Sequence, residues 1–216
     1  MKKITIAILM LLGTFSIASA ELGVNVGVSG QFGVYAAEGE ESIGAERKGD
    51  DTGIGVFTYG SIFIEKTIGQ YLSIGIDYVP ENIGSDTVET TQSVNADDAK
   101  AEKTNKASVD FEDFTTFYAS VNLTENFYVK LGMMEVDVIT KESLETGGSY
   151  PNTSLDGTMI GAGYNKDLTN GLFVRAEGTY MEFDNVKLNS SAGETKTINI
   201  KGIEGASAKI SIGKSF

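Results

Sequence analysis

Apolar and polar residues alternate along most of this chain with a period of two. In the clearest run, residues 22–36, Val24, Val26 and Val28 share one parity while Asn25 and Gln31 have the other. A helix would need a period of 3.6, so this alternation predicts β-strands. Runs of this kind number eight and span residues 22–36, 53–65, 71–79, 109–122, 127–133, 157–165, 172–180 and 205–216.

The connections between these strands alternate in length. Short segments follow the second, fourth and sixth strands, at residues 66–70, 123–126 and 166–171. Long polar segments follow the others, at residues 37–52, 80–108, 139–156 and 181–204, and the last one could hold a hairpin with its tip at 189–194. Long and short connections lie at opposite ends of an up-and-down barrel, and an even strand number lets the first strand close on the last. The sequence therefore predicts an all-β, eight-stranded antiparallel up-and-down barrel.

The facing of some strands is harder to assign. In 53–65 an aliphatic set with Ile54, Val56, Ile62 and Ile64 competes with an aromatic set of Phe57, Tyr59 and Phe63, and we interpret the aliphatic set as outward. In 109–122 we expect Phe111 and Phe117 to point outward. Around Met134 the alternation becomes ambiguous, which indicates either a bulge or the end of the apolar zone.

The last strand ends on an aromatic residue. Ala206, Ala208, Ile210, Ile212 and Phe216 share one face, and Ser207, Lys209, Ser211 and Gly213 the other. This pattern resembles the C-terminal strand that the assembly machinery of bacterial outer-membrane β-barrels recognises. The resemblance implies that Ile210, Ile212, Gly213 and Phe216 form an assembly signal. Lys214 departs from it, because the family has an apolar residue there; near a strand end a long basic side chain can reach the headgroups.

The first residues predict export. Lys2 and Lys3 precede the apolar run 4–12, and Ala18-Ser19-Ala20 is an A-x-A cleavage site, so residues 1–20 are predicted to be a cleaved secretory signal peptide. The fold then belongs to one domain, residues 21–216. Because no cysteine follows the cleavage site, a lipid-anchored lipoprotein is excluded.

Composition narrows the function classes. The net charge of −13, from 30 acidic and 17 basic residues, argues against nucleic acid as a partner. The absence of Cys and His removes disulfides, thiolate metal sites and the usual general base, so we expect no enzyme, no catalytic or metal site and no cofactor. No later stretch reaches the roughly 18 apolar residues of a spanning helix, so a membrane form must be a closed barrel.

Taken together, residues 21–216 resemble the small eight-stranded outer-membrane β-barrel superfamily, which includes the opacity-type adhesins and the OmpA-type membrane domain. The resemblance implies a transmembrane barrel in the bacterial outer membrane, with three short periplasmic turns and four long external loops, surrounded by lipid and lipopolysaccharide. No site residues transfer, because the family's shared residues are structural and its functions lie in variable loops. A soluble lipocalin-like barrel is the alternative, but no second apolar set is apparent to fill its core.

The inward faces carry the candidate functional residues. These are acidic or basic side chains at inward parity: Glu65, Asp77, Glu112, Lys130, Arg175, Glu177 and Lys209. An eight-stranded barrel is only just wide enough for such side chains to fill it, so they are predicted to form an ion-pair network, with Gly163 opposite Arg175 leaving room for the guanidinium. The preferred interpretation is a polar plug in a protein with a structural and surface-interaction role. The alternative is a narrow porin-like channel for ions or small solutes.

The long loops are acidic. Clusters at residues 38–41, 50–51 and 97–98 could bind divalent cations that bridge to lipopolysaccharide phosphates, but they lack the spacing of a calcium loop. A solvated loop surface that faces an unknown external partner is the simpler interpretation.

Overall fold

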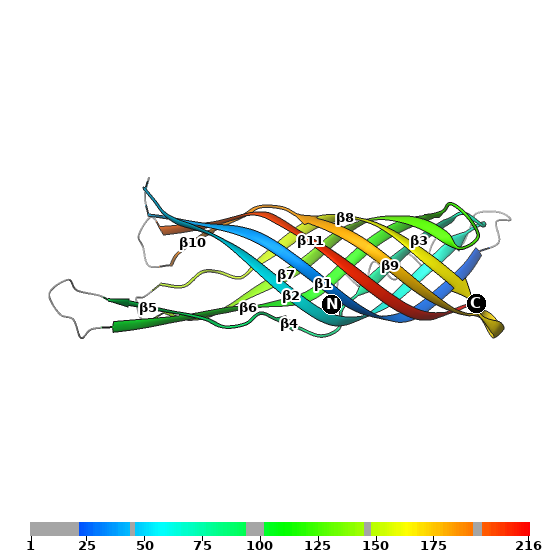
Figure 1. Ribbon diagram of the computed structural model, residues 1–216, viewed down its shortest axis with the longest axis horizontal. Helices are drawn as coiled ribbons and strands as arrows, with labels where there is room; N and C mark the ends of the chain where they lie inside the picture. Colours follow the sequence, from blue (N-terminus) through cyan, green and yellow to red (C-terminus); the bar gives the residue numbers. More distant parts are fainter. Residues whose placement is uncertain (1–21, 44–45, 94–101, 145–147, 192–195) are drawn as a thin grey trace.

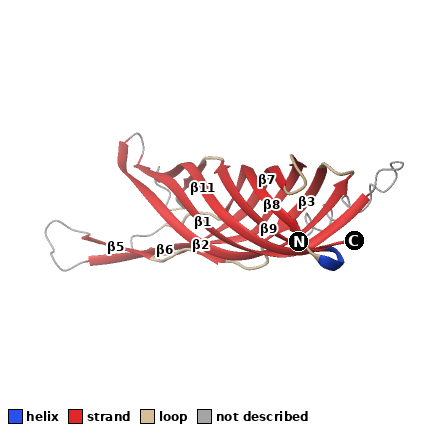
Figure 2. Cartoon of the chain, turned by 45° about the vertical axis from the view of Figure 1, so that its right-hand side comes forward, coloured by secondary structure: helices blue, strands red, loops and turns tan. Residues whose placement is uncertain are grey.

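A computed structural model of the chain describes residues 22–43, 46–93, 102–144, 148–191 and 196–216. Its elements, in chain order, are β1 (Leu22–Ile43), β2 (Glu46–Ile68), β3 (Leu72–Tyr78), β4 (Ile83–Gly84), β5 (Val88–Ser93), β6 (Glu102–Asn122), β7 (Phe127–Leu144), β8 (Thr153–Asp167), the 3-10 turn η1 (Thr169–Gly171), β9 (Leu172–Phe183), β10 (Val186–Asn189) and β11 (Lys196–Ser215). Figure 2 shows a wall made almost entirely of strands. Within the described ranges no helix is long and apolar enough to cross a membrane.

Eight of the strands form a closed ring. They pair in the order β1-β2-β3-β6-β7-β8-β9-β11, and β1 pairs with β11 to close it. Every ring contact is antiparallel, so the predicted eight-stranded up-and-down barrel is confirmed. The connections after β2, β6 and β8 are short and lie at what we call the short-turn end, near the C-terminus in Figure 1. The other end is the long-hairpin end.

The apolar stripes face outward. Phe32, Ile160 and Ile210 expose 51%, 56% and 64% of their surfaces, whereas the inward Glu65 exposes 1%. The competing faces of β2 are also settled, because Ile54 is 73% exposed while Tyr59 is 4% exposed. The outward interpretation of the aliphatic set is thus confirmed. A sheet with this polarity suits an apolar surrounding and a polar lumen.

The long polar segments are mostly strand, contrary to the expectation of loops. β1 and β2 pair as far as Ile43 and Glu46, and β5 forms a hairpin with the start of β6. The expected last hairpin is confirmed, since Val186 pairs with Ile200 and Leu188 with Ile198. The acidic pair at 97–98 lies outside the described residues.

A bulge in β6 overturns two interpretations. The register with β7 shifts between Glu112 and Thr115, and Asp113 has a positive φ of 52°. A single extra residue reverses which face each side chain occupies. Phe111 therefore packs against the inner apolar cluster instead of pointing outward, and Glu112 loses its place in the lumen.

A second break opens between β2 and β3. β2 pairs with β3 only from Ile62 onward, and continued register would set Pro80 opposite Gly60. Proline has no N–H for the ladder, so the pairing stops there. The chain turns to β6 instead, where the Val79 amide donates to the Phe114 carbonyl at 3.0 Å, and the Glu81 carboxylate accepts the Gly60 N–H at 3.1 Å. Beyond this point the β1–β2 hairpin and the β4–β6 segment diverge toward the long-hairpin end (Figure 1).

Candidate functional site

Six charged side chains meet in the barrel lumen in the half nearer the short-turn end. We call them the charged layer: Glu65, Asp77, Lys130, Arg175, Glu177 and Lys209. They come from β2, β3, β7, β9 and β11, strands that the ring closure brings together. Three acids face three bases, so the layer is formally neutral.

Glu65 is the most completely bonded member. Arg175 donates from Nη1 to its Oε2 at 2.8 Å and from Nη2 to its Oε1 at 2.5 Å. Asn25 donates to Oε1 at 2.7 Å and Tyr118 to Oε2 at 2.9 Å. Four donors thus serve two carboxylate oxygens, the arrangement that a buried carboxylate needs to remain charged.

The cation of this pair is held from its other sides. Arg175 donates from Nε to the Asn165 side-chain oxygen at 2.9 Å, and its guanidinium lies 4.5 Å from the centre of the Phe173 ring. The aromatic face favours a cation, most of all where water is excluded. The planar group is therefore fixed in one orientation across the lumen.

Two further ion pairs complete the charged layer. Lys209 donates to Asp77 at 2.8 Å, and Lys130 donates to Glu177. Lys130 also lies 4.2 Å from the centre of the Tyr118 ring. All four side chains are buried, and each charge has an opposite partner, so the network avoids the several kcal/mol that an unpaired buried charge costs.

Two predicted details of the network are wrong. Glu112 is absent from the charged layer and accepts a hydrogen bond from Asn82 at 2.6 Å on the outside, because of the bulge. Gly163 lies between Tyr128 and Glu177 in the sheet, and it is Asn165 that pairs with Arg175. The ring of Tyr128 occupies the space above Gly163, so that space is not available to the guanidinium.

Aromatic rings seated on glycines recur along the inner wall. A Cβ on Gly75 would lie 2.5 Å from the Tyr118 ring, and a Cβ on Gly205 would overlap the Tyr35 ring. Only glycine lets a ring lie this close to the neighbouring backbone. Tyr35 stands on the first strand and Gly205 on the last, so this contact crosses the closure of the ring.

An apolar plug fills the lumen toward the long-hairpin end. It consists of buried side chains from six strands or segments: Tyr59, Val79, Phe114, Met134, Val136, Leu155, Met181 and Phe183. This second apolar set was not expected from the sequence. The ambiguous alternation at Met134 and Val136 was its signal, since β7 keeps an unbroken register with β8 through these residues. The bulge lies on β6 instead.

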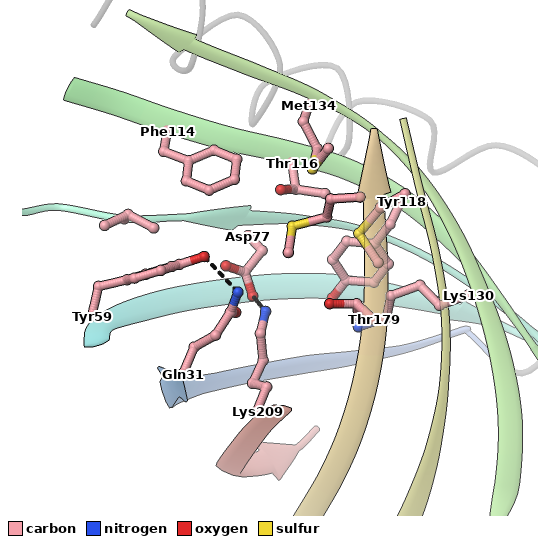
Figure 3. Close-up of a pocket in the computed structure, with 13 residues that line it drawn as sticks. Gln31, Tyr59, Asp77, Phe114, Thr116, Tyr118, Lys130, Met134, Thr179 and Lys209 are labelled. Carbon is pink, nitrogen blue, oxygen red and sulfur yellow. Dashed lines mark hydrogen bonds and ion pairs between the residues drawn. The ribbon is translucent and has the colours of Figure 1, made fainter. Parts of the chain in front are cut away.

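Between the two fillings the structure leaves a cavity of only about 20 Å³. Figure 3 shows Lys209 reaching Asp77 and Gln31 reaching Tyr59 beside it. Gln31 donates to the Tyr59 hydroxyl at 2.6 Å, and Tyr35 and Tyr59 share a further hydroxyl contact of 2.6 Å. A space of this size holds about one water molecule.

The lumen widens at the short-turn end. A polar cavity of about 230 Å³ is lined there by Asn25, Ser73, Ser120, Asn165 and Arg175, among others. Arg175, which pairs with Glu65, forms part of its lining. The barrel therefore has a polar mouth at one end, then the charged layer, and the apolar plug beyond it.

The residues of the predicted assembly signal lie on β11 and at the C-terminus. Ile210, Ile212 and Phe216 are exposed at 64%, 50% and 72%, and Gly213 faces inward beneath the Phe173 ring. Phe216 exchanges backbone hydrogen bonds with Val24 at 2.9 and 3.1 Å. Ala18 and Ala20 lie outside the described residues.

Comparison with solved structures identifies the fold. The outer membrane protein OprG from Pseudomonas aeruginosa aligns over 89% of this chain and 95% of its own, with a TM-score of 0.57 and 11% identity. The chain has the fold of a small outer-membrane β-barrel. Similarity is lower to Ail of Yersinia pestis, which has a TM-score of 0.42 and 9% identity over 88% of this chain and 99% of its own. Neisserial surface protein A has a TM-score of 0.39 and 12% identity over 87% of this chain and 97% of its own. No family model and no curated protein matches the sequence.

Proposed function

We propose that this chain is an integral outer-membrane β-barrel with a closed lumen and a structural, surface-interaction role. The observation that carries the proposal is the double filling of the lumen. The charged layer lies toward the short-turn end and the apolar plug toward the long-hairpin end, with a cavity of about 20 Å³ between them. An ion would have to displace one filling and then the other. Function then belongs to the surface, where the long hairpins reach outward.

The membrane setting rests on the outward stripes and on the likeness to OprG. Exposed aliphatic and aromatic side chains cover the middle of the barrel, and a Tyr or Phe such as Tyr71, Phe127 or Tyr180 stands toward each rim. Such rims match the aromatic girdles of outer-membrane barrels. In this orientation the short-turn end faces the periplasm, and the acidic hairpins face lipopolysaccharide and the medium.

Single-channel conductance of the refolded protein in planar bilayers tests the closed lumen. We expect no steady openings from the wild type. A matched variant with Phe114, Met181 and Phe183 replaced by Ala opens much of the plug but keeps the charged layer, so it should also show no steady openings. Steady wild-type openings that disappear in Lys130→Met or Arg175→Met would instead establish the narrow-channel alternative.

Export and assembly complete the proposal. Residues 1–20 would be removed after Ala20, so sequencing of the outer-membrane form should begin at Glu21. Deletion of Phe216 should leave export intact but prevent folding by the assembly machinery. Lys214→Gln, which removes only a charge, should leave both export and folding intact. Normal amounts of folded barrel without Phe216 would refute this part.

A further inference from the structure

Between Glu46 and Gly60, strand β2 pairs with β1 on one side, and no strand among the described residues pairs with its other side. The backbone N–H and C=O of Val24 both bond to Phe216, the residue that follows β11. The backbone groups of even-numbered β1 residues therefore point toward β11, and those of odd-numbered residues point toward β2. The backbone N–H and C=O groups of even-numbered β2 residues therefore point away from β1. The Gly60 N–H, which points to Glu81, agrees with this assignment.

This free edge is short and its ends are capped. The Glu81 carboxylate accepts the Gly60 N–H at 3.1 Å, and the Asp51 carboxylate accepts the Thr52 N–H at 2.9 Å. Between them lie Ile54, Val56 and Thr58. Among the described residues no strand pairs with these three on that side.

The uncapped residues are also strongly exposed. Ile54 and Val56 present 73% and 57% of their surfaces, so the residues with unpaired backbone groups also carry exposed apolar side chains. Such an edge is the usual template for strand addition by another polypeptide, because main-chain hydrogen bonds provide affinity and alternate side chains provide selectivity.

Charge around the edge indicates the kind of partner. Asp51 and Glu81 stand at its two ends, and Glu112 lies across the gap beside Asn82, which donates to it at 2.6 Å. The whole chain carries a net charge of −13. An acidic segment would be repelled here, while lysine or arginine side chains could pair with carboxylates on both sides of the gap.

We propose that the edge of β2 at residues 54–58 binds an extended cationic polypeptide segment by strand addition. The proposal rests on the surface-interaction role above and gives it a class of partner. The added strand bonds to Ile54, Val56 and Thr58 and places its basic side chains near Asp51 and Glu81. Pro80, by ending the β2–β3 pairing, is the residue that keeps this edge available.

Amide hydrogen exchange on the refolded wild type in lipid nanodiscs tests the edge directly. Without a partner, the amides of Ile54, Val56 and Thr58 should exchange fast and those of Phe57 and Tyr59, which face β1, slowly. The probe is a blocked synthetic peptide of alternating lysine and valine, with an alternating glutamate–valine peptide as control. We expect the lysine peptide alone to protect the three edge amides, with an affinity that falls as salt rises.

A proline scan separates backbone from side-chain recognition. Val56→Pro removes an N–H that has no native partner, so the barrel should fold while peptide affinity falls about tenfold, equivalent to about 1.4 kcal/mol for a lost hydrogen-bonded position. Val56→Thr keeps the N–H and should bind as the wild type does. Ile54→Pro repeats the test if Val56→Pro does not fold.

Three results would overturn the proposal: equal binding of the glutamate peptide, unchanged affinity in both proline variants, or no protection of the edge amides at saturating peptide. Displacement of the peptide by a fatty acid with retention of fast exchange would instead assign the edge to small apolar molecules, and would also overturn it. Because none of these measurements depends on conductance, their failure leaves the closed lumen to its own test.

Discussion

The two fillings of the lumen solve the same problem in different ways. The charged layer closes the barrel with three directed ion pairs, in which Glu65 alone receives four hydrogen bonds. The apolar plug closes it with close packing of residues such as Phe114, Met134 and Met181. Directed pairs define one arrangement of the strands, whereas apolar packing tolerates exchanges of similar volume. The two halves should therefore respond very differently to substitutions of the same size.

The largest effect is expected from breaking one ion pair. Lys130→Met keeps the length of the side chain but leaves Glu177 buried without its partner, which should destabilise the barrel by about 3–5 kcal/mol. Urea unfolding in lipid vesicles, followed by the gel shift of the folded form, measures this. The double variant Lys130→Met, Glu177→Met should recover most of the loss, and a double variant as unstable as the single one would contradict the comparison.

A smaller loss is expected where a ring rests on the wall. A Cβ on Gly75 would lie 2.5 Å from the Tyr118 ring and 2.8 Å from the Cβ of Glu65, so Gly75→Ala should cost about 1–3 kcal/mol by displacing a donor of the charged layer. Gly178→Ala is the matched control, because nothing lies within 4 Å of a Cβ there. The same unfolding titration compares them, and equal losses would show that ring seating is unimportant.

The apolar plug should be more forgiving. Met181→Leu conserves volume and loses only the long hydrogen bond of 3.8 Å that the Tyr35 hydroxyl donates to the Met181 sulfur, so its cost should stay below about 1.5 kcal/mol. Met181 is nevertheless buried to 2% exposure, as deeply as the charged residues. If this exchange proved as harmful as Lys130→Met, burial and not bond direction would control the stability of the lumen.

The smallest effect concerns charges on the outside. Glu182 and Glu204 are directly opposed in the sheet and both are exposed, in contrast to the paired charges inside. Like charges in this position repel weakly, so Glu182→Gln should raise the free energy of unfolding by roughly a few tenths of a kcal/mol and shift the urea midpoint slightly upward. The gain should vanish in high salt, and a gain that persists in salt would have another origin.

Periodicity predicted the strands and most facings because side chains in a barrel wall meet two different environments. The alternation is clear over residues 22–36 of β1 and 205–213 of β11, and even β2 was assigned correctly from its aliphatic set. Six of the charged residues were placed inside from parity alone. Where both environments are apolar, as around Met134 and Val136, parity carries no information and the plug stays hidden in the sequence.

Two further features left no periodic trace. The bulge at Asp113 adds one residue without a glycine or any break in composition, so Phe111 and Glu112 were assigned to the wrong faces. The hairpins beyond the apolar zone are wetted on both sides, so strands such as β5 have the composition of a loop. Pro80 did predict the end of β3, because its missing donor acts through the backbone alone.

The seat of Tyr35 on Gly205 has a consequence for how the molecule forms. Its ring belongs to the first strand and its glycine to the last, so the ring can reach its position only once the cylinder has closed. The chain contains no tryptophan, and tyrosine emission is thus not masked. The chain has nine tyrosines, so a change in emission that is lost in Tyr35→Phe would report the final step of maturation, when the first and last strands pair.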